Sequence, residues 1–233
     1  AIPDGWCLLD PIKFGIVAPG MNDDGSLAKS GIPGDLVTAY LGQRGIVPSR
    51  TTSHMVLFLF SMGVTKGKWG TLINTMLDFK RDYDANTPLA DAMPRVLAGA
   101  PARYAGMGVK DLGDAMWAEL RASRMGHWEA AAYAQLPVPE CTPRAAFQKM
   151  MAGEVELVGL DDLAHRVVTV GVIPYPPGIP IVMPGENIGA ADGAWISYMR
   201  VLQNWAHAFP GFAKEVEGTI EKEGVYHVYC LKK

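Results

Sequence analysis

The alternation of apolar and polar positions predicts an α/β layer in the first third of the chain. A strand over residues 12–17 ends at a Pro-Gly pair, and a helix is expected to start near Pro33, since proline suits a first helical turn. Gly45 can end that helix, and residues 45–50 and 56–60 are strand-like. A long amphipathic helix follows, with an apolar face of Trp69, Leu72, Ile73, Met76 and Tyr83. We expect one sheet buried under two helices.

The local amino-acid composition changes near residue 86, where glycines and prolines begin to recur at short intervals. The later pattern predicts helices over residues 111–122, 143–151 and 195–209 and strands over residues 154–158, 166–172 and 225–231. Thr142 is the expected N-cap of the second of these helices. The predicted fold class is therefore α/β followed by α+β, with one domain over residues 1–90 and another over residues 91–233.

Composition narrows the class of protein. The chain has 233 residues, of which 49% are hydrophobic and 19% charged, so a packed core is expected rather than disorder. The net charge of -3 argues against a general nucleic-acid binder. The longest apolar run, residues 55–60, is far shorter than the roughly 20 residues of a membrane span. No membrane and no nucleic-acid partner is expected.

Metal-binding and nucleophile motifs are missing from the sequence. Cys7, Cys141 and Cys230 have no metal-ligand spacing and are expected to be reduced thiols of a cytoplasmic protein. The five histidines are dispersed, so no metal is expected. Residues 63–68 (GVTKGK) follow a strand as a phosphate-binding loop does, but the spacing of the glycines is too short and Trp69 replaces the hydroxyl residue. A tight strand-to-helix turn is the better interpretation.

Residues 173–186 form a proline-rich segment that ends in an acidic residue. Because proline fixes φ and lacks an N–H group, the sequence predicts a stiff, extended path outside any sheet. Such a segment can line a substrate entrance or act as a strut between domains, and the residues do not decide between these roles.

The amino terminus begins at Ala1 without a methionine, and core-type residues start at once at Trp6. Removal of the methionine explains this, and so does a chain that is part of a longer protein.

Four collinear stretches then carry a resemblance to a known family. They are residues 9–13 (LDPIK) with 18–21 (APGM), residues 31–41, residues 57–63 (LFLFSMG) with 78–81 (DFKR), and residues 175–180 (YPPGIP) with 209–212 (FPGF). The chain resembles the carboxy-terminal part of the prokaryotic ornithine/lysine/arginine decarboxylases, which are fold-type-I enzymes dependent on pyridoxal 5'-phosphate (PLP). Residues 45–52, 60–72 and 80–89 are most similar to the acid-inducible, biodegradative arginine decarboxylases.

The resemblance implies a fold for each half. Residues 1–90 look like the small α/β subdomain of an aspartate-aminotransferase-like PLP fold, and residues 91–233 look like the family's carboxy-terminal α+β domain. An amino-terminal wing domain and the large PLP domain would precede them. The resemblance therefore favours a chain that is part of a longer protein over removal of the methionine alone. The family forms homodimers, and its inducible members form decamers.

The resemblance also implies a reaction, the conversion of arginine to agmatine and CO2, which consumes a proton and serves acid resistance in the cytoplasm. The family's Schiff-base lysine follows a histidine, and this sequence has no His-Lys pair. No catalytic residue is therefore expected in this chain, which alone should neither catalyse the reaction nor bind PLP. A lysine or ornithine decarboxylase stays open, as does a non-catalytic interaction or assembly domain of the same fold.

The substrate pocket is expected to be walled by residues 49–54, with Ser49, Arg50, Thr52 and His54 as substrate-binding candidates. Lysine-specific relatives have a glutamate where Ser49 stands, close to the distal ammonium group of the substrate. A planar guanidinium needs a different set of partners, so the serine is consistent with arginine. Alternatively, Ser49 is a solvent-facing strand residue.

Overall fold

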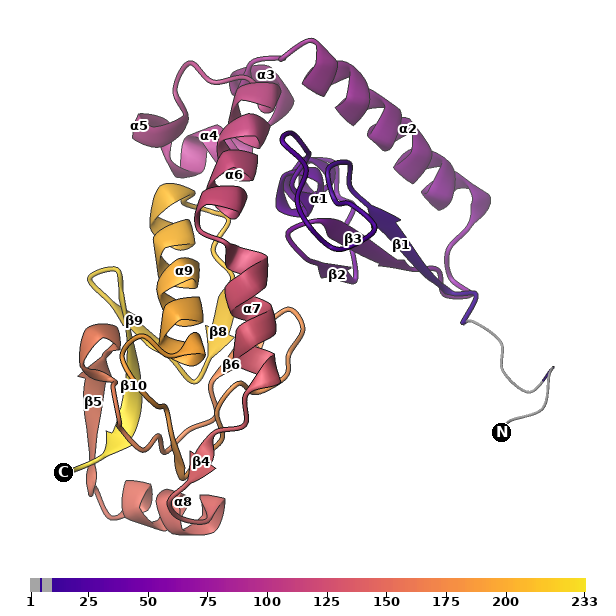
Figure 1. The fold of residues 1–233 in the computed structure, drawn as a ribbon. Coiled ribbons are helices and arrows are strands. Elements are labelled where there is room, and N and C mark those ends of the chain that lie inside the picture. The colour runs from indigo at the N-terminus through magenta and orange to yellow at the C-terminus, as the bar shows by residue number, and fades with distance from the viewer. Residues whose placement is uncertain (1–4, 6–9) are drawn as a thin grey trace. The chain divides into compact units, whose positions relative to one another are not determined.

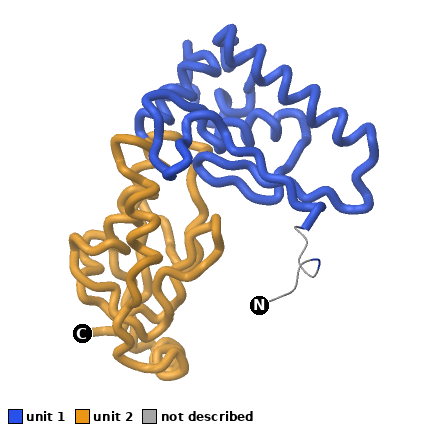
Figure 2. Tube along the Cα trace, turned by 45° about the vertical axis from the view of Figure 1, so that its right-hand side comes forward, with its two compact units in different colours: residues 1–119 blue, residues 120–233 orange. Residues whose placement is uncertain are grey.

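The structure is a computed structural model that describes Gly5 and residues 10–233. It divides into two compact units, residues 1–119 and residues 120–233 (Figure 2). Each unit mixes helices with antiparallel strands, which confirms the mixed α/β class. The domain boundary expected after residue 90 stays a prediction. The core-type residues that begin at Trp6 lie outside the described residues.

The first unit is built on a three-stranded antiparallel sheet in the order β1-β3-β2 (Figure 1). Its strands are β1 (Lys13–Val17), β2 (Arg50–Thr51) and β3 (Met55–Leu59). The strands predicted over residues 12–17 and 56–60 are thus confirmed to within a residue. The strand predicted over residues 45–50 is wrong except at its end, where only the short β2 pairs with β3.

Helix α1 (Gly34–Gln43) covers one face of this sheet by packing on β2 and β3. Pro33 is its N-cap residue, one position before the first turn in which the sequence places it, whereas Gly45 follows the end of the helix with a φ of +75°, as the sequence predicts. The packed side is almost closed to solvent, since Leu36 and Tyr40 are fully buried. The apolar spacing and the end signals of this helix therefore agree with its tertiary contacts.

Helix α2 (Lys66–Asp84) packs on α1, and the ring of Phe79 meets the ring of Tyr40 edge to face at 5.1 Å. The apolar face expected for α2 is wrong in part, because Trp69 and Ile73 are 41% and 50% exposed. The buried stripe of α2 consists of Leu72, Thr75 and Phe79, and Trp69 and Ile73 lie beside this stripe on the helix surface rather than within it.

The rest of the first unit is helical. It comprises α3 (Leu89–Ala92), α4 (Pro94–Gly99), α5 (Pro101–Tyr104) and α6 (Val109–Ala122), whose last residues belong to the second unit. Asn86 caps α6: its Oδ1 atom accepts hydrogen bonds from the N–H groups of Lys110 and Asp111 at 3.0 and 3.1 Å. The side-chain amide of Asn86 donates in return to the Asp111 carboxylate, a bond that lowers the pKa of that carboxyl group.

Trp117 of α6 anchors the loop between β1 and α1. Its Nε1–H group donates to the carbonyl oxygen of Ala28 at 3.1 Å, and its ring lies against Gly20 and Gly31. A Cβ atom at either glycine would overlap the indole ring, so these positions require glycine. The contact fixes the path that leads the chain from β1 into α1.

The second unit has a three-stranded antiparallel sheet in the order β5-β10-β9, with the helices α7, α8 and α9 around it (Figure 1). Its elements are α7 (Met125–Ala134), β4 (Val138–Pro139), α8 (Pro143–Met151), β5 (Val155–Gly159), the 3-10 helix η1 (Leu160–Asp162), β6 (Ile173–Tyr175), β7 (Glu186–Asn187), α9 (Ala194–Ala208), β8 (Glu215–Glu217), β9 (Ile220–Lys222) and β10 (Val225–Leu231). Helix α9 packs on both α7 and β10. Its indole groups are satisfied, since Trp195 donates to Ala132 O at 2.9 Å and Trp205 donates to Phe212 O at 2.8 Å.

Two sequence expectations fail in this unit. The strand predicted over residues 166–172 is wrong: Val168 bridges β10, whereas Val172 bridges Val182, so no ladder continues. The proline-rich segment, expected outside any sheet, contributes β6, in which Pro174 pairs with Val216 of β8. A two-stranded ladder has only edge strands, where a residue without an N–H group is tolerated.

No helix in the described part of the chain is both long and apolar enough to span a bilayer. Of the three cysteines, Cys141 and Cys230 are free thiols, and Cys7 lies outside the described residues.

The N-cap of α8 gives a stability test. The hydroxyl of Thr142 accepts the N–H group of Ala145 at 3.2 Å, as the sequence predicts. We expect Thr142→Ala to lower the free energy of unfolding of the second unit by about 1 kcal/mol, because one helix-end donor loses its partner. Urea denaturation followed by circular dichroism measures this. Thr142→Ser, which keeps the acceptor, should stay close to wild type, and equal losses in the two variants would contradict the capping role.

Candidate functional site

The four substrate-binding candidates lie together on the hairpin formed by β2, its turn and β3. Ser49 precedes β2, Arg50 starts it, and Thr52 and His54 lie in the turn. The hairpin is closed by backbone bonds: the Ser49 N–H group donates to Leu57 O and the Thr52 N–H group donates to Met55 O, both at 2.8 Å. Ser49 is exposed, and the other three candidates are half-buried.

The pairing register assigns the β2 side chains to the two faces of the sheet. Thr51 is paired with the buried Val56, and its hydroxyl is 2.6 Å from the hydroxyl of Thr38 on α1. Thr51 therefore faces α1. Since neighbouring strand residues point to opposite faces, Arg50 lies on the face turned away from α1, beside its partner Leu57. A guanidinium carried on that face can take part in recognition outside the core of the unit.

The turn itself is held from three directions. Inside it, the Thr52 hydroxyl oxygen accepts from the Met55 and His54 N–H groups at 3.0 and 3.4 Å. From outside, the Gly34 N–H group of α1 donates to Ser53 O, and the Ala18 N–H group donates to His54 O, each at 2.8 Å. Thr52 thus has a structural role as a turn former, which leaves its O–H group to donate to a ligand.

Sequence reasoning missed the contacts that hold this hairpin. Gly34 and Thr38 were expected only as part of a helix, and neither stands out by residue type or spacing. Their importance arises from the approach of α1 to the turn, a tertiary contact without a local signal. A glycine at the first position of a helix was the single available hint.

The described lysines do not fit a PLP site. All of them are exposed except Lys214, which is half-buried. A lysine that holds PLP as a Schiff base is enclosed and desolvated, so that its amine loses its proton readily. None of the described lysines therefore lies in the enclosed surroundings that a Schiff-base lysine needs.

Exposed apolar side chains mark two surfaces of the first unit. Trp69, Ile73 and Leu77 follow one another at helical spacing along α2 and are 41%, 50% and 62% exposed. On the sheet, Val17 and Leu59 are also about half exposed and lie on the face away from α1. The strip on α2 is continuous, and an apolar surface of this kind is typical of a contact with another protein segment.

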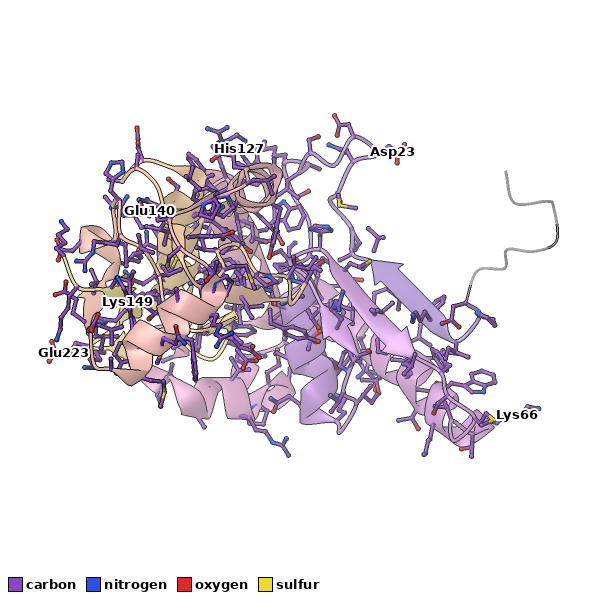
Figure 3. All side chains as sticks on the ribbon, turned by 90° about the horizontal axis from the view of Figure 1, so that it is seen from below. Asp23, Lys66, His127, Glu140, Lys149 and Glu223 are labelled. Atoms are coloured by element: carbon purple, nitrogen blue, oxygen red, sulfur yellow. The ribbon has the colours of Figure 1, made fainter. Side chains whose placement is uncertain are left out.

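Charged side chains are spread over both units rather than gathered at one centre. In the second unit the labelled side chains His127, Glu140, Lys149 and Glu223 come from four different segments (Figure 3). Among residues 5 and 10–233, no three His, Cys, Asp or Glu side chains come together in a way that could hold a metal ion.

A depression of about 460 Å³ lies in the second unit. It is lined by residues of both charges, namely Gly159, Asp161, Asp162, Lys222, Glu223, Val225 and His227. Asp161 already pairs with Arg200, whose guanidinium is 3.2 Å away, and the imidazole Nδ1 atom of His227 is 2.9 Å from Val225 O. Two of the polar groups in the lining, Asp161 and His227, are thus already engaged within the unit.

Glu129 of α7 is the carboxyl group with the most unusual surroundings in the second unit. Burial raises its pKa, and the positive charge of Lys214 opposes that rise. Tyr133 and Tyr198 belong to the same cluster: burial raises the pKa of Tyr133 to about 12, and the charge of Glu129 adds to the effect at both phenols. The cluster lies on helices α7 and α9, and none of these groups comes from the hairpin of the first unit.

The fold is similar to parts of solved bacterial lysine decarboxylases. It superposes on the constitutive lysine decarboxylase of Escherichia coli with a TM-score of 0.92 and 36% identity, over 96% of this chain and 32% of that one. It also superposes on lysine decarboxylase A of Pseudomonas aeruginosa with a TM-score of 0.89 and 41% identity, over 97% of this chain and 31% of the other.

The chain belongs to the Orn/Lys/Arg decarboxylase family. Residues 1–68 match the model of the family's major domain, and residues 127–232 match the model of its C-terminal domain. Among curated relatives, the biodegradative arginine decarboxylase of E. coli strain K12 is 54% identical over 99% of this chain and 31% of its own length. The chain thus spans about a third of the length of the relatives it matches.

The Glu129 cluster gives a pH prediction. Because its pKa is raised, Glu129 stays protonated in the folded second unit at pH values above the ordinary carboxyl pKa of 4.5. The stability that comes with the protonated form is complete below that value and is lost as the pH rises through the folded-state pKa. Glu129→Gln should therefore raise the urea midpoint at pH 7, and this gain should disappear below about pH 4.

The matched control is Glu217→Gln, which removes the same charge from an exposed residue of β8 in the same unit. Urea titrations between pH 3.5 and 8 compare both variants with wild type. A gain for Glu129→Gln that is the same at every pH would show that the carboxyl group is not the cause.

Proposed function

We propose that this chain is the carboxy-terminal part of a PLP-dependent arginine decarboxylase that converts arginine to agmatine and CO2. The observation that carries the proposal is the 54% identity to the biodegradative arginine decarboxylase, against 41% and 36% to two lysine decarboxylases over nearly the same residues. A match of this length to the arginine enzyme favours the same substrate.

The first unit then contributes the small subdomain of an aspartate-aminotransferase-like PLP fold, within residues 1–90, and residues 91–233 form the family's carboxy-terminal domain. In this arrangement the hairpin with Ser49, Arg50, Thr52 and His54 walls the substrate pocket. Two features support this role: the turn is rigidly held, and Arg50 lies on the sheet face that α1 leaves open. A guanidinium substrate would be recognised there without the carboxylate that suits an ammonium group.

The exposed apolar surfaces support the proposed partners. Trp69, Ile73 and Leu77 on α2, with Val17 and Leu59 on the sheet, are available to pack on the amino-terminal wing and large PLP domains of the same enzyme. We place the Schiff-base lysine and PLP in the large domain. The complete enzyme is then a cytoplasmic homodimer, with a decamer as its higher assembly, and serves acid resistance because each turnover consumes a proton.

Incubation of the full-length enzyme with arginine, lysine and ornithine tests the substrate directly. We expect agmatine as the main product, measured by chromatography together with the CO2 released. Preferential formation of cadaverine from lysine would overturn the arginine assignment, and no release of CO2 from any of the three would favour a non-catalytic role.

Position 49 gives a sharper test of the pocket. Ser49→Glu in the full-length enzyme places a carboxylate where lysine-specific relatives carry one, so we expect the ratio of kcat/KM for arginine over lysine to fall by about tenfold or more, the effect of one desolvated charge contact. Ser61→Glu adds the same charge at another exposed serine of the first unit and should leave the ratio unchanged. An unchanged ratio in Ser49→Glu would place Ser49 in solvent, outside the pocket.

A further inference from the structure

We infer that Gly34 and Thr38 of helix α1 are positioning residues for substrate binding, because they hold the hairpin that carries the substrate-binding candidates. This inference rests on the proposed function of the hairpin. Neither residue lies on the hairpin, and neither belongs to the set of residues proposed to contact the substrate.

Gly34 lets the start of α1 come into direct backbone contact with the hairpin turn. Its N–H group donates to Ser53 O at 2.8 Å. A Cβ atom at position 34 would overlap the carbonyl oxygen of Thr52 and lie 3.1 Å from both the N and O atoms of Met55. Because the obstacle is backbone on the other side, no side chain can swing away, and an added methyl group must displace the turn.

Thr38 makes the second contact, one turn further along α1. Its hydroxyl is 2.6 Å from the hydroxyl of Thr51, and both residues are half-buried. This bond keeps Thr51 turned toward α1. It thereby also fixes Arg50 on the opposite face, since the side chains of adjacent strand residues alternate.

The two contacts act on different parts of the same hairpin. Gly34 sets the position of the turn that contains Thr52 and His54, and Thr38 sets the orientation of β2 with Arg50. A shift of the turn changes the distance from the candidate side chains to a bound substrate. The expected consequence is weaker substrate binding and poorer discrimination at the distal group, while the chemical step, which uses groups elsewhere in the enzyme, changes little.

Steady-state kinetics of Gly34→Ala and Thr38→Val in the full-length enzyme test the inference. We expect each variant to raise KM for arginine by about fivefold or more, with kcat changed by less than about twofold. We also expect the ratio of kcat/KM for arginine over lysine to fall in both. General loss of stability would instead lower the active fraction and hence kcat, leaving KM and the substrate ratio as in wild type.

Matched controls come from the same helix. Gly42→Ala places a methyl group in open space on α1 and should leave KM unchanged. Thr38→Ser keeps the hydroxyl, so its KM should be close to that of wild type and below that of Thr38→Val. If Gly34→Ala does not fold, the Thr38 pair alone decides the outcome.

Unchanged KM and unchanged substrate ratio in Thr38→Val, in an enzyme that decarboxylates arginine, would overturn the inference and leave the proposed function standing. Failure of the wild-type enzyme to act on arginine is a different result, which would overturn the proposed function itself.

Discussion

The close approach of helix α1 to the β2–β3 turn is the contact on which the arrangement of the first unit depends. At Gly34 the helix backbone and the turn backbone touch, and the amide of Gly34 bonds to the carbonyl of Ser53. The same helix buries Leu36 and Tyr40 against its neighbours, so its position is fixed by packing on one side and by the turn on the other. The hairpin is therefore a rigid element, although its β2 strand is only two residues long.

A second constraint is that α1 covers the sheet of the first unit only in part: it packs on one face of β2 and β3, and Phe14 of β1 on that same face is 52% exposed. On β3, Val56 points toward α1. The strand register puts Leu59 and Val17 on the opposite face, where both are about half exposed. Along α2, the side chains of Trp69, Ile73 and Leu77 likewise stay partly exposed. Together with the coverage of about a third of each relative, this surface is what one expects of a unit that completes its core against further domains.

Sequence reasoning succeeded where a local pattern and a local end signal coincide. Helices α1 and α8 have apolar spacing and recognisable caps, and β10 is a run of strand-forming residues, so their bounds were predicted almost to the residue. It failed where tertiary context decides. Residues 166–172 have the composition of a strand, but their bridging partners change along the segment. Pro174 joins a ladder because that ladder has only edges.

The candidate site likewise depends on tertiary contacts that have no local signal in the sequence. Nothing in the residue types of Ser49, Arg50, Thr52 and His54 identified a pocket, and family resemblance supplied them. The structure adds that they share one hairpin, that Thr52 has a turn-forming role, and that Arg50 lies on the open face. The residues that hold the hairpin could not be found from the sequence, because Gly34 and Thr38 matter only through contacts with residues distant along the chain.

The proposed function requires this hairpin to face the distal group of the substrate. The most direct measurement is an experimental structure of the full-length enzyme with agmatine bound. We expect the guanidinium of agmatine to lie within hydrogen-bonding distance, about 3.5 Å, of at least one polar atom of residues 49–54. A guanidinium bound elsewhere, with the hairpin separated from it by other segments of the protein, would exclude the hairpin from the substrate pocket.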